Sequence, residues 1–177
     1  MIMNKTIQFI TRTAILLALT VLFQSLRVIF PIPANISQFL IGSLVNLALI
    51  AAAVVVGLKG GLAIAVAAPV IAFIQGFTPF PVLVPFIAAG NLVLVAAVAL
   101  LYEKQPVLSI ALGAVIKFIV LYIGIVQVAL PFLIPNIKPP QAAALSASFS
   151  WPQLVTAAIG GVVALAVLPL LKRAVKY

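Results

Sequence analysis

Residues 82 to 102 read VLVPFIAAGNLVLVAAVALLY, a run of 21 residues without a charged side chain. A helix needs about 20 predominantly apolar residues to cross the ~30 Å hydrocarbon core of a bilayer, and this run meets that requirement. A water-soluble fold would have nowhere to place so much apolar surface. The run therefore predicts a helix that spans a membrane.

Similar runs fill most of the chain, which has 177 residues, of which 66% are hydrophobic and 6% charged. Pro, Gly and charged residues interrupt the apolar sequence and divide it into six runs. These runs cover residues 7–29, 37–56, 61–76, 82–102, 107–134 and 151–171. The first run has basic flanks like a signal peptide, but it is long and no convincing cleavage site follows, so we expect it to be retained. We predict an all-α integral membrane protein, a bundle of six transmembrane helices that forms a single domain over residues 1–177.

The distribution of Lys and Arg predicts the orientation, because cytoplasmic ends of spans carry the excess of positive charge. On one side lie seven cations: Lys5, Arg12, Lys59, Lys104, Lys172, Arg173 and Lys176. The other side has Arg27 and Lys138, and Lys117 falls inside a span. We therefore expect both termini and the loops at 57–60 and 103–106 to be cytoplasmic. The connections at 30–36, 77–81 and 135–150 would then face outward.

Polar residues inside the spans are few, and such residues usually face a bundle interior or a cavity. Gln38, Gly42 and Asn46 share one helix face by their spacing of four, and Lys117, Gly124 and Gln127 are expected to share another. In the fourth span, Gly90 and Asn91 lie at a depth similar to that of Asn46. In the sixth span, Gln153, Thr156 and Gly160 share one helix face. Four polar faces predict a central pocket that opens outward, with glycines leaving room and Asn46, Asn91, Lys117 and Gln127 as its polar contacts. The alternative is that the amides and small residues only hold helices together.

Lys117 favours the pocket interpretation, because the chain offers it no carboxylate. The only acidic side chain is Glu103, which is some 20 Å away along the helix axis. A buried ammonium without a counter-ion needs carbonyls, water, deprotonation or an anionic ligand.

The residues that are absent exclude several classes of function. With one acidic side chain, no His and no Cys, the chain lacks the groups for a metal site, a thiol nucleophile or paired-carboxylate chemistry, so we expect neither an enzyme nor a cofactor. The ten Lys and Arg are scattered singly, which argues against nucleic-acid binding despite the net charge of +9. No phosphate-binding loop is present, so energy from ATP would have to come through another polypeptide.

Ala14 and Ala18 lie four residues apart in the first run, and small residues at this spacing allow another helix to approach closely. Together with the six spans, the small size and the missing energy module, the chain resembles the substrate-binding S-components of energy-coupling factor (ECF) vitamin transporters. The segments that carry the resemblance are Ala14 with Ala18, Gly42-Ser43-Leu44-Val45-Asn46, Pro79-Phe80-Pro81 with Pro85, Gly90-Asn91 and Trp151-Pro152-Gln153-Leu154.

The resemblance implies capture of a water-soluble vitamin or precursor outside a bacterial cell membrane. Delivery would require a transmembrane coupling subunit, contacted by Ala14 and Ala18, and two ATPase subunits. It also implies a site in the outer halves of the later helices, with Asn91, Gln127, Trp151 and Gln153 as substrate contacts, and gates at residues 30–37 and 76–81. Pantothenate, cobalamin and hydroxymethylpyrimidine all remain candidates.

The alternative functions are a stand-alone facilitator or channel and a structural membrane protein without a ligand. A stand-alone facilitator or channel would need a polar path through both membrane faces, whereas residues 47–56, 94–101 and 162–171 are almost all Ala, Val, Leu or Ile. A structural or assembly membrane protein without a ligand would use the buried amides for packing alone.

Overall fold

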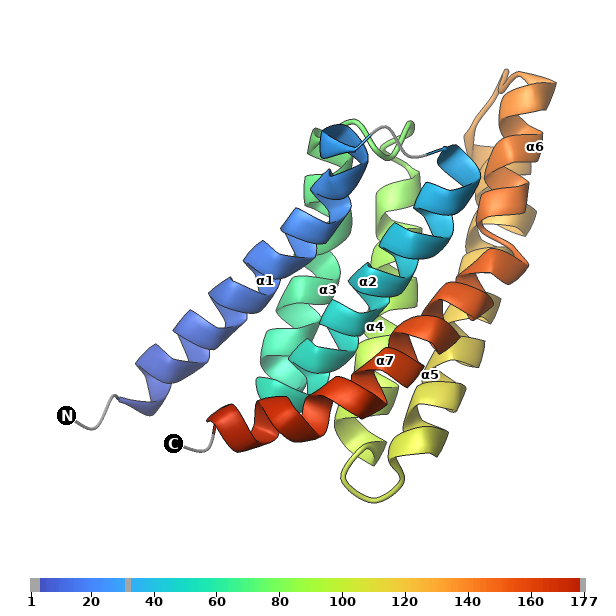
Figure 1. Cartoon of the computed structure of the whole chain (residues 1–177). Coiled ribbons are helices and arrows are strands. Elements are labelled where there is room, and N and C mark those ends of the chain that lie inside the picture. The colour runs from blue at the N-terminus through green and yellow to red at the C-terminus, as the bar shows by residue number, and fades with distance from the viewer. Residues whose placement is uncertain (1–3, 31–32, 176–177) are drawn as a thin grey trace.

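The computed structural model describes residues 4–30 and 33–175 and consists of helices joined by short connections (Figure 1). In chain order the helices are α1 (Lys5–Ile29), α2 (Ala34–Val55), α3 (Gly57–Ile74), α4 (Leu83–Leu101), α5 (Pro106–Leu121), the π-helix η1 (Tyr122–Leu133), α6 (Pro139–Ser148) and α7 (Trp151–Val175). Within these described ranges, six segments are long and apolar enough to cross a membrane: Lys5–Ile29, Ile36–Val55, Gly57–Ile74, Leu83–Leu101, Pro106–Leu133 and Pro139–Arg173. The predicted all-α membrane fold with six spans is confirmed.

The start of α1 and the end of α7 lie at the same end of the bundle, together with the turn between α4 and α5 (Figure 1). We call this the terminal end; α6, the end of α1, the start of α2 and the connection from α3 to α4 lie at the opposite end, which we call the loop end. The basic residues of the predicted cytoplasmic side therefore gather at the terminal end, apart from Lys176, which is outside the described residues. Which end faces the cytoplasm remains a prediction from this charge asymmetry.

The loop predicted at residues 57–60 is wrong, because α3 already begins at Gly57. Val56 alone separates α2 from α3, and Gly57 after it has a φ of +79°, a conformation that favours glycine. The next two glycines are helical and allow close packing. A Cβ on Gly60 would lie 2.9 Å from Thr13 Oγ1 of α1, and one on Gly61 would lie 2.7 Å from Val95 Cγ1 of α4.

The outer connection at 135–150 also differs from the expected loop, since it contains the ten-residue helix α6. Pro139 and Pro140 open this helix, where a proline costs no intrahelical hydrogen bond. Alanines at 142–144 then continue it with good helix propensity. None of the residues of α6 is buried, so this helix covers the bundle from outside rather than forming part of its core.

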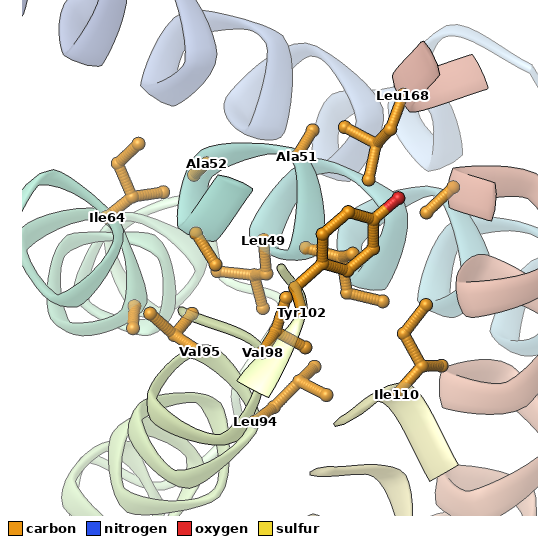
Figure 2. Packing of buried hydrophobic residues seen from close by; sticks show 14 residues of the cluster. Leu49, Ala51, Ala52, Ile64, Leu94, Val95, Val98, Tyr102, Ile110 and Leu168 are labelled. Carbon is orange, nitrogen blue, oxygen red and sulfur yellow. The ribbon is translucent and has the colours of Figure 1, made fainter. Parts of the chain in front are cut away.

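A large cluster of buried apolar side chains fills the terminal half of the bundle (Figure 2). It brings together the late part of α2, the early part of α3, the late part of α4 and the second half of α7. The ring of Tyr102 lies among aliphatic side chains that include Leu49, Val98 and Leu168 (Figure 2). The runs of Ala, Val, Leu and Ile that distinguish this half of the sequence therefore form a packed core.

Candidate functional site

A cavity of about 700 Å³ lies in the half of the bundle nearer the loop end, and the volume is typical of small-molecule sites. All seven α-helices contribute to its lining, as do Phe77, Thr78 and Pro79 from the connection between α3 and α4. Its deepest polar residues, Asn46, Asn91 and Lys117, adjoin the apolar cluster of the terminal half.

These three residues form one hydrogen-bonded group, which we call the floor cluster. The Lys117 Nζ donates to Asn46 Oδ1 at 2.6 Å and to Asn91 Oδ1 at 2.8 Å. Each amide then donates through its nitrogen to a different helix: Asn46 Nδ2 to Thr156 Oγ1 at 3.3 Å and Asn91 Nδ2 to the Ala65 carbonyl at 3.4 Å. All three side chains of the floor cluster are buried, with 4% or less of their surface exposed. Asn46, Asn91 and Lys117 therefore line one cavity, as the sequence predicted, and their role as substrate contacts stays a prediction.

Of the glycines expected to leave room in the pocket, Gly42 lines the cavity, whereas Gly90, Gly124 and Gly160 admit neighbouring helices. A Cβ on Gly160 would lie 2.5 Å from the Ser43 carbonyl oxygen and 2.9 Å from Asn46 Cβ. A Cβ on Gly90 would lie 2.7 Å from Leu121, and one on Gly124 would lie 2.6 Å from the Phe86 ring. The close approach at Gly160 holds α7 against α2, and this approach brings Thr156 within reach of Asn46.

Gln153 lines the cavity as predicted, near the loop end. Its Nε2 donates to the Ser148 carbonyl at 3.0 Å, and Gln38 Nε2 of α2 donates to the same oxygen at 2.9 Å. Through this shared carbonyl the two glutamines connect the end of α6 to both α2 and α7. They therefore hold α6, which contributes Leu145 and Ser148 to the cavity wall, in place.

Gln127 does not line the cavity, and the expectation that it shares a face with Lys117 is wrong. Its side chain is exposed and donates to the Tyr122 hydroxyl at 3.1 Å. The physical reason is the change from α5 to the π-helix at Tyr122. Bonding from i to i+5 puts more residues in each turn, so each residue rotates by less and Gln127 is carried away from the face of Lys117.

Trp151, also predicted as a substrate contact, is 61% exposed and is not among the cavity-lining residues. Its ring packs against that of Phe39, with centroids 5.6 Å apart. Tryptophan commonly occupies the interface between lipid and water, and this position at the start of α7 fits such an anchoring role.

The structure adds two cavity residues from α1 that the sequence reasoning missed. Gln24 is buried and donates through Nε2 to the Ala68 carbonyl at 3.2 Å. Arg27 lies at the exposed rim, with its guanidinium carbon 4.6 Å from the centroid of the Phe77 ring. The spacing of Thr20, Gln24 and Arg27 was a usable signal, because positions i, i+4 and i+7 form one polar stripe on a helix.

Glu103 is not available to the cavity. It lies at the terminal end, where its carboxylate accepts a hydrogen bond from Lys172 Nζ and forms an ion pair with it. Glu103 is therefore not the partner of Lys117, as the sequence predicted.

Ala14 and Ala18 are both exposed on α1. Of the 25 residues of this helix, only Thr20 and Gln24 are buried. In the isolated chain the face that carries the two alanines is therefore open to another helix or to lipid.

Membrane-spanning helices around a cavity with a largely apolar wall and converging polar groups are typical of membrane proteins that bind a small solute. The chain belongs to a specific family: residues 8–172 match the family model described as ECF transporter, substrate-specific component. No curated protein and no solved structure matched the chain significantly. The protein is thus a transport subunit rather than an enzyme, a multi-pass membrane protein that associates with the components of an ECF module.

Proposed function

We propose that this protein captures a water-soluble vitamin or vitamin precursor with high affinity. The observation that carries the proposal is the cavity of about 700 Å³, whose deepest part is the floor cluster and whose rim lies at the loop end. A few converging polar groups in an otherwise apolar cavity are typical of sites for small ligands. Asn46, Asn91, Lys117 and Gln153 are the substrate contacts of this proposal.

The import step would be driven by a transmembrane coupling subunit and two ATPase subunits in a bacterial cell membrane. The family supports this partnership, and the chain itself has no nucleotide-binding motif. With the terminal end in the cytoplasm, the cavity rim faces outward, as capture of an external solute requires.

Two connections at the loop end would act as gates. The connection from α3 to α4 supplies Phe77 and Thr78 to the cavity wall, and Arg27 of α1 lies over the Phe77 ring. The other gate covers residues 30–37; its Pro31 and Ile32 lie outside the described residues, whereas Ser37 lines the cavity.

The packed terminal half favours this function over a stand-alone facilitator. A facilitator needs a polar route from the cavity to the opposite face, but Leu49, Leu94, Val98 and Leu168 belong to the packed apolar cluster that fills the terminal half. A ligand-free structural protein would have no use for a cavity of this size, since close packing normally leaves few voids larger than a water molecule.

We expect the purified protein to bind one vitamin molecule per chain and to unfold at a higher temperature when that vitamin is present. At a ligand concentration of 100 Kd, binding to the folded state alone adds about 2.7 kcal/mol to stability. A thermal-shift screen of water-soluble vitamins, followed by calorimetric titration for stoichiometry, measures both quantities.

The matched variants for this screen are Ala72→Phe, which places a ring in the cavity wall, and Ala166→Phe, which adds the same ring to an exposed position on α7. Binding should be lost in the first and retained in the second. If no vitamin stabilises the wild type, or if Ala72→Phe binds as the wild type does, the proposed capture site is wrong.

A further inference from the structure

The charges around the cavity are unbalanced. Lys117 lies in the floor cluster and Arg27 at the rim, so cationic side chains occupy both ends of the site. The chain has one acidic side chain, Glu103, and Lys172 holds it at the terminal end. Since no other Asp or Glu exists in the sequence, no acidic side chain of this protein lines the cavity.

The surroundings of Lys117 leave capacity for one more acceptor. A lysine ammonium has three N–H donors, and the described residues accept two of them through the oxygens of Asn46 and Asn91. These oxygens are neutral, so they satisfy hydrogen bonds without cancelling the charge. An uncompensated charge in a buried site is costly, and an anion that reaches it gains a charge-assisted hydrogen bond.

The floor cluster also has a fixed orientation. The nitrogen of Asn46 is engaged by Thr156 and that of Asn91 by the Ala65 carbonyl, which directs both amide oxygens to Lys117. The cluster therefore presents a single positively charged donor. One such donor suits a carboxylate better than a phosphate dianion, which requires several donors and more positive charge.

We propose, on the basis of the transport function proposed above, that the substrate is a small organic carboxylate whose acid group binds to Lys117, with the remainder of the molecule directed toward Arg27 at the rim. Among vitamins and precursors this selects those that carry a free carboxylate and excludes neutral and cationic ones. The discrimination resides in charge, because the amide or alcohol analogue of such a compound has nearly the same size and shape but leaves the buried ammonium uncompensated.

Paired ligands test this proposal directly: nicotinate with nicotinamide, biotin with biotinamide, and pantothenate with panthenol. Thiamine, riboflavin, pyridoxine, hydroxymethylpyrimidine and cobalamin complete the panel. We expect one acid of the panel to bind the wild type at least roughly 30-fold more tightly than its uncharged partner, the size of effect seen when one member of a buried charge pair is removed.

The matched variant is Lys117→Gln, which keeps N–H donors for the two amide oxygens but removes the charge. It should bring the affinities for acid and uncharged partner to within about threefold of one another, whereas Lys117→Arg should preserve the preference for the acid. Lys104→Gln makes the same substitution at an exposed position of the terminal end and should change neither affinity. Comparing the acid with its uncharged partner in both the wild type and Lys117→Gln measures the interaction between the carboxylate and Lys117 separately from other effects of the substitution.

The outcomes separate the two proposals. If only a neutral or cationic vitamin binds, or if Lys117→Gln retains the full preference for the acid, the carboxylate proposal is overturned and vitamin capture stands. If no compound of the panel binds, vitamin capture is contradicted and the carboxylate proposal fails with it. Should Lys117→Gln not fold, the wild-type ratio within each ligand pair still decides the question.

Discussion

Gly160→Leu is expected to prevent the bundle from folding. A Cβ at this position would lie 2.5 Å from the Ser43 carbonyl oxygen and 2.9 Å from the Leu47 backbone nitrogen, and backbone atoms cannot move aside as a flexible side chain can. Even Gly160→Ala should cost about 3 kcal/mol, the upper part of the usual range for overpacking a core, and leucine considerably more. Thermal unfolding in detergent and the yield of monodisperse protein measure the effect.

The control for this prediction is Val162→Leu, which enlarges a side chain two residues further along α7 that is 67% exposed. It should unfold at nearly the wild-type temperature. A Gly160→Leu protein that is as stable as this control would mean that α2 and α7 do not pack as closely as the structure has them. Because Asn46 Cβ also lies 2.9 Å from the position of the added carbon, Gly160→Ala should weaken ligand binding as well as stability.

The sequence was sufficient to predict the six spans and to place Asn46, Asn91 and Lys117 at a similar depth around one pocket, but not the hydrogen bonds that join them. Hydrophobic length determines how many helices cross a bilayer, and that signal is strong in a chain with so few charged residues. The sequence predicts that Asn46, Asn91 and Lys117 lie near one another because each occupies a regular α-helix at a similar depth. Polar groups in lipid also tend to face the interior of a bundle. The depth and the helix face of each residue were enough to predict that the three line one cavity.

The predictions for Gln127 and for the loop at 57–60 were wrong for different reasons. Gln127 follows a change from α- to π-helix at Tyr122, and a period of 3.6 residues no longer describes its direction. The loop assigned to 57–60 failed for another reason, since glycine can break a helix or allow two helices to touch. Only the packing partners of Gly60 and Gly61 distinguish these roles, and those partners, Thr13 and Val95, are distant in sequence.

Trp151 and Arg27 were both assigned roles that differ from their places in the structure. The family resemblance suggested Trp151 as a substrate contact, yet its ring packs on Phe39 and is largely exposed. Arg27 was counted only as a charge for topology, although it lies at the cavity rim beside Phe77. Its position on one polar stripe with Thr20 and Gln24 was the local signal that could have identified it as a cavity residue.

Ala14→Leu combined with Ala18→Leu is expected to abolish uptake while leaving vitamin binding intact. Both alanines are exposed in the isolated chain, and small residues at this spacing allow a partner helix to approach closely. Two leucines would hold the coupling subunit away from α1. The cavity residues of the same helix, Gln24 and Arg27, begin six positions after Ala18, about 9 Å along the axis, so the site should be undisturbed.

Uptake of labelled vitamin by cells that also produce the coupling subunit and the ATPases measures delivery, and calorimetry on the purified variant measures capture. Ala158→Leu with Ala166→Leu provides the matched control, since both are exposed alanines on α7. If the α1 variant loses binding as well as uptake, its face belongs to the fold, and if it retains uptake, the partner docks elsewhere. Loss of uptake alone would show that capture and delivery depend on separate parts of the molecule, because binding requires only the cavity whereas transport also requires a docked partner.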